Sequence, residues 1–582
     1  MMYAIIRKRG GGAMEQYQNF KLSIYCTVQD VMKLPDTYPA FLQDLAFFQK
    51  HLKLSKVYIE TYRDDTVDSE KLLRVKDFFN RAGIETATGI TTVNAGSGKG
   101  NIASAMCYTD AGQLDELRRL FERMAGEFDE IMIDDFLSTN CACDTCREAK
   151  GGQTWEQFRL RKMTEVCRDF IIAPARAVNP KVKITIKYPT WMHSFQRLGY
   201  NPETQPFMFD ATYSGTETRH TTYSFFRNPR YTSYSLIRWL QSCPPHNNRG
   251  GWFDPYLCDN PLNSFVEQAY LTLFAKPEEL TLFCYGSLKD TKFIPLLGHE
   301  LSRMDAFLGS LGRPAGVKTY IPYHSDGEGN VYDFLGMCGV PCDPVAVFPQ
   351  EPCTVLLTAS SACDPDVLAL ARKHLTAGSD VAFTAGFVRL MQDRGLEEFT
   401  AIRLPGAVMR GNYFGAFEGC WDTAVRYNYS GKEIGMPVAD WKLNDCDYKA
   451  AMFSESMPNP LVTHNNYGGG RAYFINIPDD YADLYWLPDT VLDKYRMHLS
   501  RALPVRIEGQ AKVALFPYDN RTFVLQSFLE HGTVVRVFIK GDAAELTRLD
   551  GGGKIERLYR AGGESVFELA LTPGGHAPFS WK

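Results

Sequence analysis

Residues 130–146, EIMIDDFLSTNCACDTC, place two adjacent carboxylates and three cysteines in one short stretch. Cys141, Cys143 and Cys146 follow the pattern C-x-C-x-x-C, and thiolates at this spacing are commonly held by tetrahedral zinc. Cys107, in ASAMCYTD, is the expected fourth ligand. Four sulfur ligands leave no open position for water, so such a zinc would be structural. A set of free thiols is the alternative.

The two aspartates, Asp134 and Asp135, end an apolar run that is typical of a strand. Adjacent strand residues point to opposite sides, so the two carboxylates are expected to have different roles. Other polar side chains stand at or near the ends of predicted strands, namely Glu60, Lys187, Tyr188, Asp210 and Asp254. Carboxylates brought together in this way can act as a general acid and a general base.

The first 300 residues alternate between short apolar runs and helical patterns. The predicted strands are 21–30, 56–65, 84–93, 130–136, 182–191, 206–215, 250–256 and 280–287. Strand–helix units in series imply a parallel sheet, and eight of them imply a closed (β/α)8 TIM barrel. A doubly wound open sheet is the alternative. Barrels of this kind carry their active sites at the C-terminal ends of the strands, where the polar residues above are expected.

Two smaller regions follow the barrel, which is predicted over 15–312. The sequence pattern of residues 313–503 predicts two strands, then a helix that runs into a third strand, and then a fourth strand. This order favours a flavodoxin-like α/β domain. This region has no Gly-rich phosphate-binding motif, so no organic cofactor is expected. Residues 504–582 alternate in period two with Gly, Asn and Asp turns, which predicts a small C-terminal β-sandwich.

Composition narrows the choice of partners. The 582 residues carry a net charge of -5 without a Lys/Arg-rich block, so no nucleic acid partner is expected. No apolar run approaches the roughly 20 residues that a bilayer requires, and the N-terminal stretch lacks the apolar segment of a secretory signal. Fifteen largely unpatterned cysteines fit a reducing cytoplasm better than a disulfide framework. A cytoplasmic protein without a membrane partner is therefore expected.

A barrel with one cysteine after the third strand and C-x-C-x-x-C after the fourth resembles the glycoside hydrolase family 42 β-galactosidases. The resemblance implies a structural zinc, a flavodoxin-like trimerisation domain and a small C-terminal β-domain, in the order found here. It also implies a carbohydrate substrate and a homotrimer. The activity implied is that of a glycoside hydrolase, removing a terminal sugar of galactosyl type from small oligosaccharides or glycosides.

The resemblance also suggests catalytic residues. An Asn-Glu pair ends the fourth strand in that family, and Asp134-Asp135 stands there in this chain, which makes Asp135 the expected acid/base. The family's nucleophile is a Glu ending the seventh strand, where this chain offers Asp254. Barrels similar to α-galactosidases use Asp at the ends of strands four and six, which suggests Asp210, with Glu217 a few residues on. Two Asp in place of two Glu widen the carboxyl gap by about 2–3 Å on an unchanged barrel, so retaining and inverting mechanisms both stay open.

Several further side chains are expected to contact substrate. Trp191 and Trp252 follow or lie in strands at the active face and offer rings for stacking on a sugar. Lys187 is expected to bind a hydroxyl or a substrate carboxylate, and Asp134 to accept a sugar hydroxyl or pair with a cation. Glu60, Tyr188 and Glu217 are expected to contact the substrate. The aromatic and basic stretch 218–235 is expected to be an ordinary solvated loop after the sixth strand. The alternative is a lid that meets an acidic sugar through Arg219 or Arg227. Two other functions stay open, a carbohydrate-binding pseudoenzyme of the same fold and a metal-dependent hydrolase that uses the cysteines.

Overall fold

The computed structural model describes residues 15–63, 65–93, 106–222, 227–418, 424–441, 446–455 and 457–582. These residues fall into two compact units. The first unit comprises the described residues up to 222 together with 244–309, and the second comprises 227–243 with the described residues from 310 to 582. Each unit has a hydrophobic core of its own and is described by itself.

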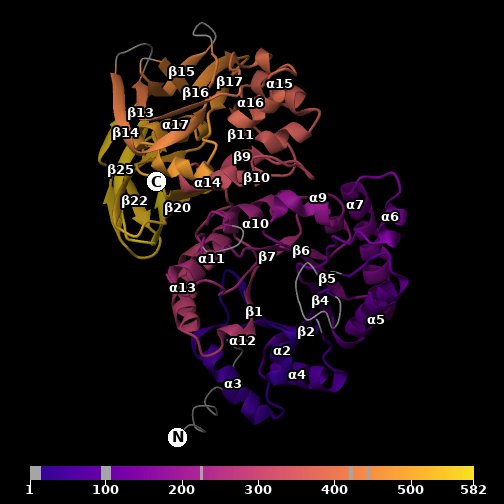
Figure 1. The fold of residues 1–582 in the computed structure, drawn as a ribbon. Helices are drawn as coiled ribbons and strands as arrows, with labels where there is room; N and C mark the ends of the chain where they lie inside the picture. Colours follow the sequence, from indigo (N-terminus) through magenta and orange to yellow (C-terminus); the bar gives the residue numbers. More distant parts are fainter. Residues whose placement is uncertain are drawn as a thin grey trace. The chain divides into compact units, whose positions relative to one another are not determined.

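The first unit is a closed barrel of eight parallel strands that follow one another in chain order (Figure 1). The strands are β1 (Lys21–Cys26), β2 (Lys56–Tyr62), β3 (Glu85–Ile90), β4 (Glu130–Ile133), β5 (Lys183–Tyr188), β6 (Ala211–Gly215), β7 (Asn248–Phe253) and β8 (Glu279–Phe283). The predicted (β/α)8 barrel is confirmed. The open doubly wound sheet is excluded because β8 returns to pair with β1 in parallel.

Helices surround these strands (Figure 1). They are α2 (Val28–Lys33), α3 (Tyr38–His51), α4 (Ser69–Arg81), α5 (Ala111–Glu127), α6 (Asp144–Lys150), α7 (Trp155–Val166), α8 (Ala173–Val178), α9 (Phe195–Leu198), α11 (Asn263–Phe274), α12 (Tyr285–Leu288) and α13 (Phe293–Leu308). A π-helical turn, η2 (Cys167–Ile172), joins α7 to α8. Local chemistry fixes several starts: Asp68 caps α4 and Asp110 caps α5, each by accepting a bond from a backbone N–H of the first turn.

An aromatic layer fills the interior of the barrel. Tyr25, Tyr58, Tyr213 and Trp252 form one buried cluster with Ala87 and Met132. Glycine makes this packing possible, because a Cβ at Gly250 would lie only 2.1 Å from the ring of Tyr213. The interior of the barrel is therefore a packed core rather than a pore. This close packing supports the side chains at the strand ends.

The second unit contains a nine-stranded sheet. Its parallel part comprises β9 (Val317–Tyr320), β10 (Cys342–Val345), β11 (Thr354–Leu357), β12 (Asp380–Thr384) and β17 (Gly470–Ile475). These strands lie in the order β10-β9-β11-β12-β17, which is the flavodoxin-like order 2-1-3-4-5. Its helices are α10 (Thr232–Ser242), α14 (Val331–Met337), α15 (Val367–Thr376), α16 (Ala385–Met391) and α17 (Asp489–Leu499). The flavodoxin-like prediction is confirmed.

Four antiparallel strands extend this sheet beyond β17, and the sequence analysis did not predict them. They are β13 (Val408–Glu418), β14 (Ala424–Pro437), β15 (Asp447–Ser454) and β16 (Met457–Tyr467). The loop predicted over 218–235 is wrong at its end, because α10 begins at Thr232 and packs on β10 within the second unit. Residues 223–226 of that stretch lie outside the described residues.

The C-terminal part of the second unit is a β-sandwich, as predicted. One sheet has four strands, β18 (Val505–Glu508), β21 (Thr533–Lys540), β25 (Glu564–Leu571) and β24 (Tyr559–Ala561). The other has five, β19 (Val513–Tyr518), β20 (Thr522–Ser527), β26 (His576–Trp581), β22 (Glu545–Arg548) and β23 (Lys554–Glu556). Apolar residues from both sheets, among them Val537, Phe567 and Phe579, form a single core.

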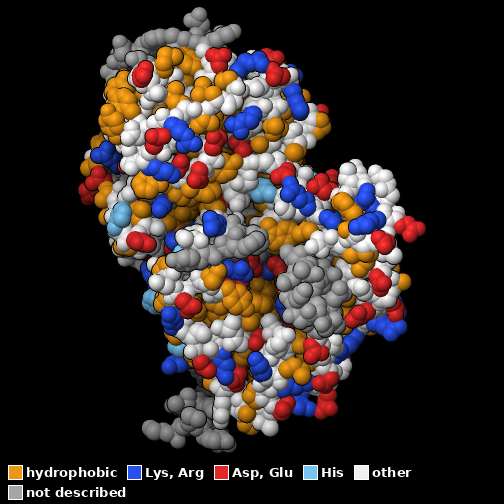
Figure 2. Space-filling model, in the orientation of Figure 1, with side chains coloured by type: hydrophobic (Ala, Val, Ile, Leu, Met, Phe, Trp, Pro, Cys, Tyr) orange, Lys and Arg blue, Asp and Glu red, His pale blue; other side chains and the backbone are white. Residues whose placement is uncertain are grey.

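Charged side chains of both signs are interspersed over the face shown in Figure 2. This mixture leaves no large field of one sign on that face. Across the described helices, none combines the length and the apolar character that crossing a bilayer requires.

Candidate active site

Three carboxylates meet one lysine at the C-terminal ends of the barrel strands. Lys187 Nζ, from the end of β5, lies 3.0 Å from Asp135 Oδ2, 2.9 Å from Glu217 Oε1 and 3.3 Å from Asp134 Oδ1. The same ammonium lies 4.3 Å from the centroid of the Trp252 ring, on which it rests. Lys187 therefore joins the side chains that follow β4 to the one that follows β6.

Arg63 forms a second link on the side of β2. Its guanidinium lies 3.0 Å from Asp134 Oδ2, and its Nε donates to Glu60 Oε2 at 3.0 Å. Glu60 also accepts hydrogen bonds from Tyr25 Oη at 2.8 Å and Thr91 Oγ1 at 2.7 Å. The carboxylate of Asp134 is therefore held at both oxygens, because Arg63 binds Oδ2 and Lys187 binds Oδ1.

Arg219 and Asp254 form a third link at the ends of β6 and β7. Arg219 Nε donates to Asp254 Oδ1 at 2.9 Å and its Nη2 donates to Oδ2 at 2.6 Å, a two-point pair. Arg219 has a φ of 54°, in the left-handed region that is uncommon for residues other than glycine. Its backbone N–H donates to Gln268 Oε1 at 3.2 Å, which holds this conformation. Strained backbone of this kind is frequent at functional sites.

Burial and neighbouring charges shift the pKa values of these carboxyl groups by different amounts. Burial raises the pKa of Asp135 to about 7; Lys187 opposes the shift, and the charges of Asp134 and Glu217 add to it. Burial also acts to raise the pKa of Asp134, but Lys187 and Arg63 outweigh it and hold that pKa below its usual value. The pKa of Glu217 is raised by burial, against the effect of Lys187. Asp135 is thus the carboxyl group that can carry a proton near neutral pH.

The carboxyl groups also differ in how much of each side chain is exposed to solvent. The side chain of Asp135 is 21% exposed, that of Glu217 8% and that of Asp254 3%. Both oxygens of Asp254 are occupied by Arg219, and Oδ1 also accepts from Tyr256 N at 3.1 Å. Glu217 has a close backbone neighbour, since a Cβ at Gly215 would lie 2.5 Å from its Oε2. Asp135 and Glu217 are therefore the two carboxylates most open to a ligand.

Protein-family models match three successive parts of this chain. Residues 10–296 match the family model described as the catalytic domain of a probable glycosyl hydrolase, and residues 504–579 match the model of the C-terminal domain of a probable glycosyl hydrolase. Residues 312–480 match the second domain of the uncharacterised protein SSO3021. SSO3021 of Saccharolobus solfataricus is 24% identical over 511 residues, which is 79% of this chain and 82% of the relative.

Several solved structures of similar fold are glycosidases. A catalytic mutant of a GH42 β-galactosidase from G. stearothermophilus has a TM-score of 0.65 at 13% identity, covering 97% of this chain and 98% of its own. This chain is family 42-like in fold. The β-galactosidase of Bacillus circulans sp. alkalophilus has a TM-score of 0.64 at 10% identity, and α-L-fucosidase isoenzyme 2 of Paenibacillus thiaminolyticus has 0.64 at 12%. Each covers 98% of this chain and 100% of its own length.

One predicted catalytic residue of this family 42-like barrel lies at the wrong end. Asp210 precedes β6, at the N-terminal end of the strand, and is 38% exposed. Its Oδ2 accepts from Ile184 N at 2.8 Å, near the start of β5, and lies 3.2 Å from Arg176. The prediction that Asp210 ends the strand is wrong because β6 begins one residue after it. Asp210 therefore does not join the cluster.

Three predicted substrate contacts are buried instead. Tyr188 follows Lys187 in β5 and so points to the opposite side, where it packs against Phe195 and Tyr200. Trp252 is enclosed in the aromatic layer, and Glu60 is fully buried beneath Arg63. The structure therefore gives Trp252 and Glu60 supporting positions and places Tyr188 outside the site.

Trp191 packs against the same two rings as Tyr188. It follows β5, is half-buried, and meets the rings of Phe195 and Tyr200 edge-on at centroid distances of 5.8 and 5.5 Å. Arg63 and Thr91, which the sequence analysis did not single out, also belong to the cluster. Both lie near the C-terminal ends of the predicted strands 56–65 and 84–93 and directly follow the observed β2 and β3, so the rule that singled out Glu60 and Lys187 would have found them.

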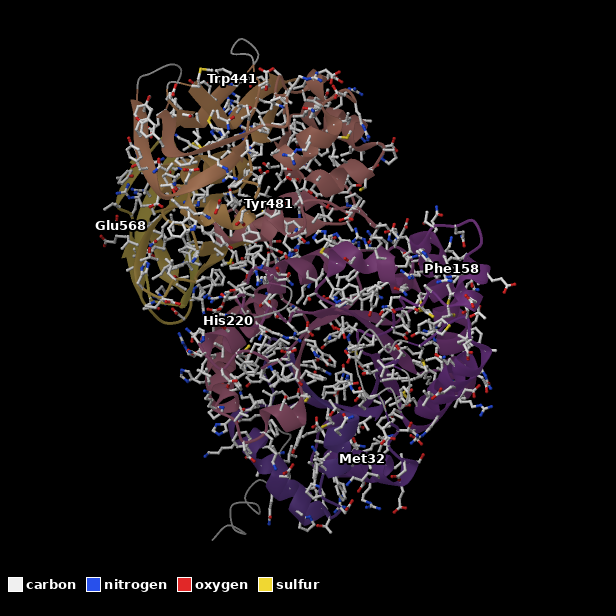
Figure 3. The ribbon with its side chains drawn as sticks, viewed as in Figure 1. Met32, Phe158, His220, Trp441, Tyr481 and Glu568 are labelled. Atoms are coloured by element: carbon white, nitrogen blue, oxygen red, sulfur yellow. The ribbon has the colours of Figure 1, made fainter. Side chains whose placement is uncertain are left out.

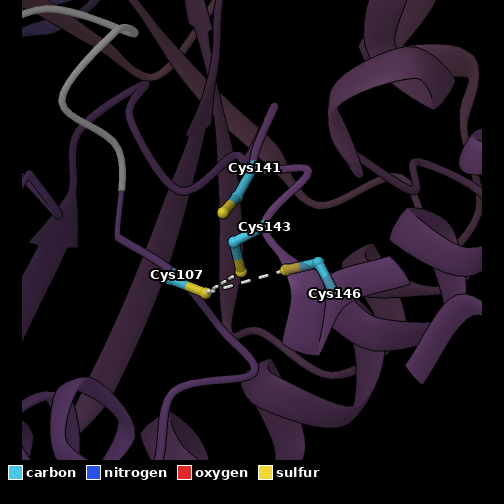
Figure 4. Close-up of side chains that lie close together, drawn as sticks. All are labelled: Cys107, Cys141, Cys143 and Cys146. Carbon is cyan, nitrogen blue, oxygen red and sulfur yellow. Dashed lines mark hydrogen bonds between the residues drawn. The ribbon is translucent and has the colours of Figure 1, made fainter. Parts of the chain in front are cut away.

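The four predicted cysteine ligands converge. Cys107 Sγ lies 3.7 Å from Cys143 Sγ and 3.6 Å from Cys146 Sγ (Figure 4). All four sulfur atoms, that of Cys141 included, lie within 4.8 Å of one another. Zinc at about 2.3 Å from each of four sulfurs requires sulfur–sulfur distances of about 3.8 Å. The spacing of the four sulfurs therefore fits a tetrahedral metal ion.

Removing the central ammonium should destabilise the barrel in a pH-dependent way. Lys187→Met leaves three buried carboxylates without their shared cation, so we expect a loss of about 3–5 kcal/mol at pH 8. The loss should shrink at pH 5, because Asp135 and Glu217, whose pKa values are raised already, then take up protons. Calorimetric unfolding at both pH values measures this. Lys21→Met, at a lysine that is 45% exposed, is the control, and equal losses at the two pH values would refute the arrangement.

Proposed function

We propose that this chain is an active glycoside hydrolase that removes a terminal sugar, of galactosyl type, from small oligosaccharides or glycosides. The observation that carries the proposal is the lysine bridge, in which Asp135 and Glu217 bind the same ammonium while Asp135 holds a raised pKa. Glycosidases require one carboxyl group that is protonated and a second that is ionised, on either side of the bond to be cleaved. Release of nitrophenol from aryl glycosides tests the proposal.

The spacing of the pair favours a retaining mechanism. Asp135 Oδ2 and Glu217 Oε1 each lie within 3.0 Å of Lys187 Nζ, so these oxygens are at most about 6 Å apart, less than the 6.5–9.5 Å typical of inverting enzymes. Asp135 would protonate the leaving oxygen while Glu217 attacks the anomeric carbon. Asp135 would then deprotonate water, which releases the sugar from Glu217.

Glu217 supports this role better than Asp254, which stands where family 42 has its nucleophile. Asp254 is engaged at both oxygens by Arg219, and attack on a sugar would require breaking that pair. Glu217 makes one bond to Lys187 and is more exposed. We therefore assign Asp254 to positioning Arg219, and Asp134, bound by Lys187 and Arg63, to orienting the cluster.

The pH dependence should follow Asp135. As the acid, Asp135 must carry its proton, so kcat/KM is expected to fall about tenfold per pH unit above about pH 7, its pKa. Burial raises the pKa of Glu217 as well, so activity should also fall on the acid side once Glu217 is protonated. A pH profile of kcat/KM on one aryl glycoside gives both limbs. An alkaline limb that persists unchanged in Asp135→Asn would exclude Asp135 as its source.

The cysteine cluster is proposed to hold a structural zinc. Four thiolates satisfy a tetrahedral ion completely and leave no position for a reacting water, so the metal would stiffen the loop after β4 and take no part in the chemistry. We expect about one zinc per chain, and Cys146→Ser should lose it and lower the Tm by several degrees. Cys363→Ser, at an exposed thiol outside the cluster, should change neither. Loss of activity in a zinc-free protein that remains folded would contradict a structural role.

Two further predictions from the sequence stay predictions, the homotrimer and the cytoplasmic location. Trp191 is proposed to line the sugar-binding cleft, since it is a half-buried aromatic residue that follows β5, the strand that carries Lys187.

A further inference from the structure

A cavity in the second unit has the size of a small-molecule site and is separate from the barrel cluster. Its volume is about 630 Å³, within the range of about 300–1,000 Å³ that is usual for ligand pockets. Residues of α17, β13 and the C-terminal sheet line it, among them Phe417, Thr490, Lys494, His498, Phe538 and Tyr559. Nothing in the proposed hydrolase reaction uses these residues.

The charged side chains that line the cavity are paired, with one exception. The pairs are Arg426 with Glu418 at 3.2 Å, Arg506 with Glu508 at 2.6 Å and with Glu564 at 2.7 Å, Arg496 with Asp493 at 2.6 Å, Arg536 with Glu568 at 3.7 Å, and Lys449 with Asp447. Glu568, labelled in Figure 3, lies on β25. Lys494 is the lining cation with no carboxylate at ion-pair distance among the residues that the structure describes.

Lys494 is nevertheless buried. Its exposed fraction is 7%, and it lies on α17 between Val491 and His498. A buried ammonium without a partner is costly, and proteins normally pair it or neutralise it. Burial lowers the pKa of Lys494, while the carboxylates of Glu418 and Glu508 act in the opposite direction from beyond pairing distance. The cavity therefore contains a positive charge with which no carboxylate of the described residues forms an ion pair.

A buried polar atom without a hydrogen-bond partner lies in the same wall. His498 Nε2 is buried and has no hydrogen-bond partner among the described residues, and His498 is one helical turn from Lys494, so both face the cavity. Phe417 and Tyr559 offer ring surfaces beside them, and Thr490 offers a hydroxyl. A cation, a ring nitrogen, aromatic faces and a hydroxyl form a set that suits a sugar-sized molecule carrying an acidic group.

We propose that this cavity is a binding site for an anionic sugar, with Lys494 pairing with the carboxylate or phosphate and His498 bonding to it or to a neighbouring hydroxyl. The site lies wholly within the second unit and does not depend on the proposed hydrolase activity. Uronic acids and sugar phosphates share the required chemistry. Bound there, either would supply the missing partner of Lys494.

Calorimetric titration and thermal melting of the full chain test this site. The probes are galacturonate, galactose 6-phosphate, inorganic phosphate and neutral galactose. We expect one of the two acidic sugars to bind and to raise the Tm by about 2–4 °C at saturation. Lys494→Met should weaken that binding at least about tenfold. Lys449→Met, at a lysine of the same cavity that is already paired with Asp447, should leave it nearly unchanged.

The variants also report on folding. Without ligand, Lys494→Met is expected to melt at the same or a higher temperature, because it removes a charge that has no ion-pair partner from a largely buried side chain. Equal binding of inorganic phosphate would support the anion site and assign it to phosphate alone. Binding of an acidic sugar that survives Lys494→Met, or no binding of any acidic probe to the wild type, would overturn the proposal. A marked drop in the Tm of ligand-free Lys494→Met would also overturn it, since Lys494 would then have a structural partner.

Discussion

Replacing Asp135 with Asn is expected to slow the hydrolysis of a glycoside with a poor leaving group by about 10²–10⁴-fold. The amide keeps the size of the side chain but has no proton to give to the leaving oxygen. A dinitrophenyl glycoside, whose leaving group departs without protonation, should lose much less in its first step. The measurement is kcat/KM for wild type and variant on an alkyl glycoside and on a dinitrophenyl glycoside of the same sugar.

The comparison between leaving groups separates chemistry from structure. A variant that folds poorly or binds sugar poorly would lose activity on both substrates to the same extent. Equal losses, with an unchanged melting temperature, would therefore show that Asp135 is not the general acid. Asp134→Asn is a useful companion, because Asp134 lies beside Asp135 but is held by Lys187 and Arg63. It should slow both substrates alike through misplacement of the cluster.

Replacing Glu217 with Gln is expected to lower hydrolysis by at least about 10⁴-fold, whatever the leaving group. A nucleophile is needed for good and poor leaving groups alike, and an amide oxygen is a weak one. Lys187 can still donate to the side-chain oxygen of the new amide, so the variant should fold. Activity on the dinitrophenyl glycoside, compared with wild type under identical conditions, gives the effect.

Asp254→Asn is the informative comparison for Glu217. Because Asp254 is proposed to position Arg219, its replacement should cost less than the loss of Glu217. The anomer first released, observed by NMR, should match that of the substrate if Glu217 forms a covalent intermediate. Loss of all activity in Asp254→Asn with activity kept in Glu217→Gln would move the nucleophile to the position that the family resemblance suggests.

The sequence predicted the elements better than their exact ends. All eight barrel strands were found because apolar runs and helical patterns alternate, and the cysteine cluster was found because its spacing is distinctive. Asp210 was misplaced because PFMFDATYSG is apolar on both sides of the aspartate, so composition alone does not show where β6 begins. The antiparallel strands β13–β16 were missed because their alternation interrupts a region that otherwise reads as α/β.

The site itself could be predicted in part. Lys187, Asp134, Asp135 and Asp254 follow directly from strand ends, since parallel strands of a barrel bring their C-terminal ends together. Tyr188 could have been excluded by the alternation of adjacent strand residues, the argument already applied to the aspartates. The role of Arg219 could not have been predicted, because its pairing with Asp254 depends on a left-handed backbone conformation in a loop.

The most direct test of the central claim is the release of nitrophenol from a panel of α- and β-linked aryl glycosides, with wild type beside Glu217→Gln. The account predicts turnover of at least one sugar and one anomer by wild type, and loss of that turnover in the variant. A folded wild-type protein that binds a sugar from the panel but hydrolyses none would contradict the account. It would identify the chain as a carbohydrate-binding pseudoenzyme of the same fold.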